Sequence, residues 1–317
     1  MRPRAALIAA LTLALAGCDF ADPGLGSSPR PLERPPELSP EDGPRVASPE
    51  SLQLAAFYRR VEQDQKVRGL MRTDDGSFDA PFTDRILAEN FLAIALFDEN
   101  PGNRISPGTA PAPSVLRKWA GPVRIALRFG ASVPQQARIQ QEAQARQYAA
   151  RLATVTGHPI AYTPARPENF TIYVVDEDER RTLLPELAQS VRGLDATTLE
   201  TIAGLPRDVY CLVIAFSGPS QRTYSRAVAF IRSELPPASW RSCLHEEVAQ
   251  GLGLPNDSPR ARPSIFNDDE EFALLTRHDE LLLAMLYDDR LTPGIAAPEA
   301  APIVRRIAAE LLGAGPV

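Results

Sequence analysis

Alternation of apolar and polar residues predicts strands in the middle of this chain. Residues 122–129, PVRIALRF, alternate with a period of two, the period at which successive side chains face opposite sides of a sheet. The same reasoning predicts strands at 170–175, 208–217 and 224–232. The last two are joined by GPSQRT, a segment of turn-forming residues, so we expect them to be consecutive strands connected by a turn.

Apolar residues at helical spacing predict helices before, between and after these strands. Ser48 is a candidate N-cap before Pro49, and Gly157 and Gly253 are candidate helix ends. The predicted helices cover residues 48–71, 83–100, 133–157, 179–194, 239–252, 278–288 and 301–312. The order strand, helix, three strands, helix indicates an α+β or mixed α/β fold in one main domain.

The first 17 residues have the pattern of an export signal. MRPR is basic and AALIAALTLALAG is apolar, but the apolar run is shorter than the about 20 residues of a membrane-spanning helix. LAGC at 15–18 resembles the lipobox of bacterial lipoproteins, which implies cleavage before Cys18 and a diacylglyceryl group on its sulfur. An ordinary secretory signal followed by a chance cysteine is the alternative.

Composition then divides the rest of the chain. Eight prolines between residues 19 and 49, with almost no apolar periodicity, predict a segment that does not fold into a core. The expected organisation is a lipoprotein signal peptide at 1–17, a Pro-rich disordered tether at 18–48, an N-terminal helical segment at 49–115, a main domain at 116–295 and a C-terminal helix or tail at 296–317.

Charge and the lipobox together predict the partners and the location. The net charge is −6, and loss of residues 1–17 removes Arg2 and Arg4 and lowers it to −8. An acidic chain without a basic run argues against nucleic acid and against an anionic membrane surface as electrostatic partners. Membrane attachment is therefore assigned to lipid at Cys18, on an exported protein that faces the periplasm. Asp19 resembles an inner-membrane retention signal of some Gram-negative bacteria, and both membranes stay open.

The three cysteines favour one disulfide. If Cys18 is lipidated, Cys211 and Cys243 are the remaining pair in an oxidising compartment, where a disulfide is expected. It would close a loop of about 32 residues and contribute about 3–4 kcal/mol in the chain-entropy model. Two buried free thiols are one alternative, and a Cys-x-His metal clip formed by Cys243 and His245 is another.

The stretch CLHEEVAQGLGLPND, residues 243–257, resembles the metzincin zinc-site motif His-Glu-x-x-His-x-x-Gly-x-x-His. In the one register that fits, the motif positions are taken by Glu246 (first ligand), Glu247 (general base), Gln250 (second ligand), Gly253 (turn) and Asn256 (third ligand), with Asp257 beside it. The spacing matches, but every ligand histidine is replaced. His245 is one residue out of register and is expected to point off that helix face.

The resemblance extends over residues 119–290. SIF at 264–266 stands where metzincins have their Met-turn, with Phe in place of Met, and 274–288 looks like the closing helix of matrixin-type peptidases. The chain is also similar to an uncharacterised family of exported Gram-negative lipoproteins with this degenerate motif. The resemblance implies a zincin (metzincin-like) mixed sheet with a long helix and a motif-bearing helix, preceded by N-terminal helices.

The replaced ligands lead to three hypotheses for function. Glu246, Gln250 and Asn256 or Asp257 offer hard oxygen ligands, which suit calcium, magnesium or manganese better than zinc, so peptide hydrolysis is disfavoured. We predict a non-catalytic module without a cofactor that binds a peptide or protein in the peptidase groove. The alternative is an atypical hydrolase with Glu247 as general base and a divalent metal, namely zinc, manganese or calcium. In that case the acidic segment NDDEE at 267–271 would supply one more oxygen ligand. The third is a purely structural envelope lipoprotein.

Overall fold

The computed structural model describes residues 46–98, 111–191, 194–218, 222–267 and 269–313. Pro44–Val317 form one compact unit. The predicted signal peptide at 1–17, the lipidation site Cys18 and nearly all of the predicted tether lie outside the described residues.

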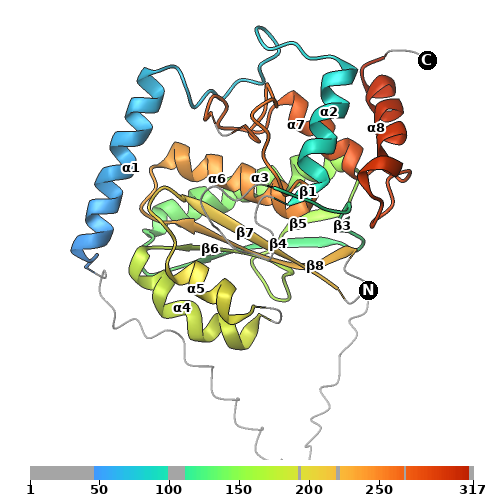
Figure 1. Ribbon diagram of the computed structural model, residues 1–317. Coiled ribbons are helices and arrows are strands. Elements are labelled where there is room, and N and C mark those ends of the chain that lie inside the picture. Colours follow the sequence, from blue (N-terminus) through green and yellow to red (C-terminus); the bar gives the residue numbers. More distant parts are fainter. Residues whose placement is uncertain (1–45, 99–110, 192–193, 219–221, 268, 314–317) are drawn as a thin grey trace, which may run out of the picture. The chain divides into compact units, whose positions relative to one another are not determined.

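A six-stranded mixed sheet lies at the centre of the described fold (Figure 1). Its strands are β3 (Lys118–Trp119), β4 (Val123–Phe129), β5 (Ile160–Tyr162), β6 (Phe170–Val175), β7 (Cys211–Ser217) and β8 (Thr223–Arg232). The order is β3-β8-β6-β4-β5, all parallel, and β7 pairs antiparallel with β8. Two short strands, β1 (Phe97–Asp98) and β2 (Ala112–Pro113), form a separate antiparallel pair.

Helices cover both faces of the sheet. They are α1 (Pro49–Val67), α2 (Asp84–Ala95), α3 (Gln135–Thr156), α4 (Glu177–Ser190), α5 (Ala196–Ala203), α6 (Pro237–Gly253), α7 (Arg277–Leu286) and α8 (Ala297–Leu311). In Figure 1, α4 and α5 lie on one face, and α3 and α6 lie on the other. Parallel strands buried between two helical layers are apolar on both sides, as in β6, where Ile172 and Val174 are buried in one core and Val175 in the other.

Local sequence signals set the ends of several helices. Asp176 caps α4 in a capping box with Glu179. Gly157 ends α3 in the left-handed conformation with φ 65°. Gly253 ends α6 with φ 132°, and a Cβ there would lie 2.3 Å from the Arg117 carbonyl oxygen. Only glycine fits at residue 253, because the backbone conformation and the neighbouring chain both exclude a side chain.

The predicted helices and strands are all found, and the α+β class is confirmed with a mostly parallel sheet. The sequence pattern does not predict α5 or the short strands β2, β3 and β5, and the predicted helix 83–100 is wrong at its end, where α2 stops at Ala95 and Phe97–Asp98 form β1. Pro185 lies inside α4, which continues to Ser190. No helix in the described part of the chain combines the length and the apolar character that crossing a membrane requires.

Candidate functional site

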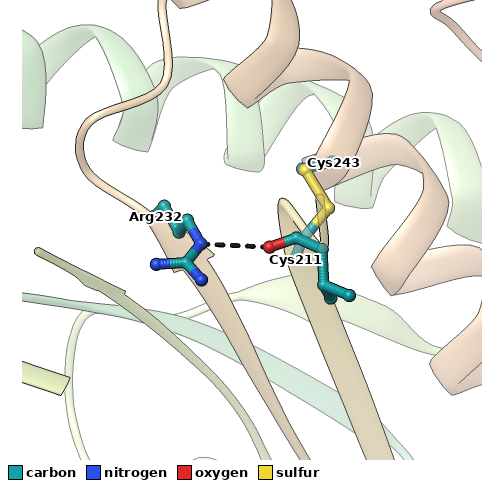
Figure 2. Close-up of a disulfide and its surroundings, with 4 residues drawn as sticks. Cys211, Arg232 and Cys243 are labelled. Carbon is teal, nitrogen blue, oxygen red and sulfur yellow. Dashed lines mark hydrogen bonds between the residues drawn. A yellow bond between two sulfur atoms is a disulfide. The ribbon is translucent and has the colours of Figure 1, made fainter. Parts of the chain in front are cut away.

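Helix α6 carries the metzincin-like motif and is fastened to β7. A disulfide joins Cys211 on β7 to Cys243 on α6, as predicted (Figure 2). Beside it, Arg232 Nε donates to the Val209 carbonyl oxygen at 3.0 Å, which holds the segment before β7 against the end of β8 (Figure 2). A Cβ at Gly251 would lie 2.5 Å from the Phe170 ring. Glycine at this position therefore lets α6 lie close against the sheet.

The motif residues occupy two adjacent rows on α6. Cys243, Glu247 and Gly251 are buried, and the Gly251 end of this row contacts Phe170 on β6 and Val213 on β7. Glu246 and Gln250, at the two ligand positions of the motif, are half-buried.

Residues four apart share a helix face, so Glu246 and Gln250 form one row together with Ser242. Around α6, the row Ser242, Glu246 and Gln250 lies on one side of Cys243, and Gly251 lies on the other side. Because Gly251 contacts the sheet interior, the row is turned away from β6. The two predicted ligand positions therefore lie along the outside of α6, next to β7.

Strand β7 is the outer strand on this side of the sheet, and its only ladder among the described residues is with β8. Arg232 N–H donates to the Tyr210 carbonyl at 3.4 Å, which makes these two residues a hydrogen-bonded pair. Hydrogen-bonded and non-hydrogen-bonded pairs alternate in an antiparallel ladder. The N–H and C=O groups of Cys211, Val213 and Ala215 therefore point away from β8.

This outer edge is open within the part of the chain that the structure describes. No other described residue hydrogen-bonds the backbone of Cys211, Val213 or Ala215, and all three residues are half-buried. Unpaired N–H and C=O groups along an edge strand can pair with another extended chain. The site is thus an open strand edge with the half-buried row Ser242, Glu246 and Gln250 beside it.

The remaining motif residues are placed differently. Glu247, the candidate general base, is only 4% exposed. Asn256, at the third ligand position, is also 4% exposed, and its Nδ2 donates to the Ala93 carbonyl on α2 at 2.9 Å. Asp257 is half-buried. Among the described residues, no three His, Cys, Asp or Glu side chains are grouped as a metal would require.

His245 is buried, about 100° around α6 from Glu246. Its ring stacks on Tyr148 with the centroids 4.0 Å apart, and its Nδ1 accepts the Leu275 N–H at 3.1 Å. Burial lowers the pKa of His245 to about 3, with smaller contributions from the positive charges of Arg241 and Arg151. The ring is therefore neutral at physiological pH and supports the core with its acceptor nitrogen.

The SIF turn is part of a buried network around Asp279. The Asp279 carboxylate accepts from Ser264 Oγ at 2.5 Å and from Ile265 N–H at 3.1 Å. It also accepts from the Thr276 N–H and hydroxyl, and Thr276 is the N-cap of α7. Phe266, at the Met-turn position, is fully buried. The Thr-x-x-Asp spacing that marks this capping box is visible in the sequence.

Glu271, in the acidic segment at 267–271, is paired with two arginines. Glu271 accepts from Arg72 at 2.9 Å and from Arg262 at 2.6 Å. Residue 268 lies outside the described residues. The described ion pairs therefore connect this segment to the loop after α1.

A comparison with models of protein families matches residues 84–306 to the family described as "Protein of unknown function (DUF2927)". The matched range begins at α2, includes the whole six-stranded sheet and α6, and ends within α8. No curated protein matches the chain.

Proposed function

The chain belongs to the family described as Protein of unknown function (DUF2927), and we propose that it is a non-catalytic module that binds an extended peptide along β7. One observation carries this proposal. The backbone of Cys211, Val213 and Ala215 faces outward without a described hydrogen-bond partner, at an edge fastened to α6 by the disulfide. A peptide that adds to this edge gains main-chain hydrogen bonds, and its side chains meet the row Ser242, Glu246 and Gln250.

The residues at the motif positions favour binding over hydrolysis. Imidazole at the ligand positions would make a zinc site, whereas Glu246, Gln250 and Asn256 supply only oxygen ligands. The amide of Asn256 is used to join the end of α6 to α2. Its Oδ1, the atom that a metal would bind, has no hydrogen-bond partner among the described residues, so the missing imidazole, and not this contact, disfavours hydrolysis.

We also propose that the fold is metzincin-like. Support comes from the antiparallel outer strand β7, the motif helix α6 directly after β8, the helix end at Gly253 and the buried SIF turn before α7. The long helix α3 between β4 and β5 agrees with the same resemblance. These features would retain a peptidase groove in which the catalytic ligands have been replaced.

Export and lipidation complete the proposal. A disulfide between Cys211 and Cys243 is stable in an oxidising compartment, which favours the periplasm over the cytosol. The LAGC sequence favours lipidation of Cys18, and the module would then act at a membrane surface of the cell envelope.

The binding edge is tested by removing one outward N–H. Proline at an edge position whose N–H faces solvent leaves the ladder with the neighbouring strand intact. Ala215→Pro should therefore fold but lose peptide binding, whereas Ala215→Val, which keeps the N–H, should bind. The soluble chain from Asp19 is used to select phage-displayed dodecapeptides, and the selected synthetic peptides are titrated against both variants. Equal affinity of Ala215→Pro and Ala215→Val would reject β7 as the site.

A further inference from the structure

Phe78 is presented to solvent on the loop between α1 and α2. Its side chain is 98% exposed, more than that of any other large hydrophobic residue in the described part of the chain. The Phe78 loop, residues 73–80, lies over the segment that follows α6 (Figure 1). An isolated exposed apolar side chain is common on protein surfaces. Phe78 differs from such an isolated residue because the backbone on both sides of it is held in place.

Arg72 connects the two sides of the Phe78 loop through hydrogen bonds. Its guanidinium donates paired hydrogen bonds to Asp74 (2.6 and 3.0 Å) and to Asp79 (2.8 and 2.9 Å), which flank Phe78 in the sequence. The same guanidinium donates to Glu271 at 2.9 Å and lies over the Phe272 ring at 4.5 Å. Paired hydrogen bonds of this kind fix geometry as well as charge.

The backbone of the loop is also packed against its neighbour. A Cβ at Gly76 would lie 2.4 Å from Pro263, and Gly76 has φ 71°, so only glycine allows this approach. Ala80 is buried, and its N–H donates to the Gly76 carbonyl at 2.9 Å. The loop is therefore held on both flanks while the aromatic ring projects outward.

We propose that Phe78 is the anchor of a protein–protein contact, inserted into an apolar pocket that basic residues border. A rigid aromatic side chain loses little conformational freedom on binding, and such residues dominate interface energies. Four carboxylates (Asp74, Asp75, Asp79 and Glu271) against two guanidiniums (Arg72 and Arg262) give the surroundings a net charge of −2. The partner surface is therefore positive. The same charge disfavours an anionic lipid surface.

A photo-crosslinker identifies the occupant. The full chain is produced in its own cells with p-benzoylphenylalanine at position 78, and in parallel at Val67 (81% exposed) and Leu52 (58% exposed) as matched exposed positions. We expect one discrete protein adduct from position 78 that the other two positions do not give. Absence of an adduct, the same adducts from position 67, a lipid adduct or an adduct with a second copy would each overturn the proposal.

The captured protein is then purified and titrated against variants of the soluble chain. Phe78→Ser should weaken binding on the order of 30-fold, as expected for a lost aromatic anchor. Its melting temperature should be unchanged, because the side chain packs against almost nothing. Asp75→Asn keeps the acceptor for the Ser77 N–H and removes only the charge, so it should weaken binding about threefold at low salt and not at high salt. Unchanged affinity of Phe78→Ser would refute the anchor.

Discussion

At the scale of single residues, the motif helix shows how one sequence signal separates into different roles. Helical spacing alone places Glu246 and Gln250 on one face, and the structure has both half-buried on the outside of α6. The role of Asn256 could not be predicted, because its hydrogen bond to Ala93 joins residues 163 positions apart. His245 is predicted to leave the ligand face, but its stacking on Tyr148 depends on how α3 packs.

The role of Glu247 is tested by Glu247→Gln, which keeps the shape of the side chain and removes its charge. If the module only binds peptides, the affinity for the selected dodecapeptides should be unchanged. Cleavage of a quenched fluorescent peptide mixture should be absent for wild type and variant alike, with zinc, manganese or calcium added. Cleavage by the wild type that disappears in the variant would support the hydrolase hypothesis, in which Glu247 is the general base.

His245 makes stability depend on pH in a defined direction. Its pKa is lowered from 6.5 to about 3 in the folded protein, so the unfolded chain binds the proton more tightly. The stabilisation is complete above pH 6.5 and declines as the pH falls toward 3, by about 1.4 kcal/mol per pH unit. Urea unfolding of wild type and His245→Gln between pH 7 and 4 should show the steeper loss in wild type. If the free energy of unfolding falls with pH equally in wild type and His245→Gln, the His245 ring does not have the lowered pKa.

At the scale of elements, length decides what the sequence can predict. Helix α3 and strands β4, β6 and β8 are long enough to show their period, and each is predicted. Strand β5 has three residues and β3 has two, too few for a period to be visible. The outer position of β7 has no sequence signal at all, because it follows from which strands pair with β8.

The disulfide connects the two elements of the proposed binding site. Replacing both cysteines, as Cys211→Ala with Cys243→Ala, releases a loop with a sequence separation of 32 and should lower the free energy of unfolding by about 3–4 kcal/mol. Amide exchange in β7 should then accelerate more than in β6, because β7 is paired on one side only. Urea denaturation and hydrogen exchange measure the two effects. Wild-type protein with the disulfide reduced should show both effects. Equal free energies of unfolding for the oxidised, the reduced and the doubly substituted protein would contradict the stabilising role of the disulfide.

At the scale of the whole molecule, packing joins segments that are far apart in the sequence and show no common pattern. Helix α2 lies against α8, and Phe91 on α2 shares one core with Val304 on α8 (Figure 1). Glu62 on α1 accepts from the N–H and hydroxyl of Ser239, in the first turn of α6. Such contacts between distant segments leave no local periodicity, so the sequence predicts the elements but not their partners.

The lipid anchor is the prediction for the molecule in the cell. We expect Cys18→Ala to move the full-length protein from the membrane fraction to the soluble periplasmic fraction, since burial of the acyl chains would be the only anchor. Intact mass spectrometry of the wild-type protein should show a chain that begins at Cys18 and carries a diacylglyceryl group. Asp19→Ser tests the retention signal, because it should shift the protein toward the outer membrane if Asp19 acts in that way. Membrane association of a Cys18→Ala chain whose mass shows that residues 1–17 have been removed would mean that a surface of the folded part, and not the lipid, holds the protein there.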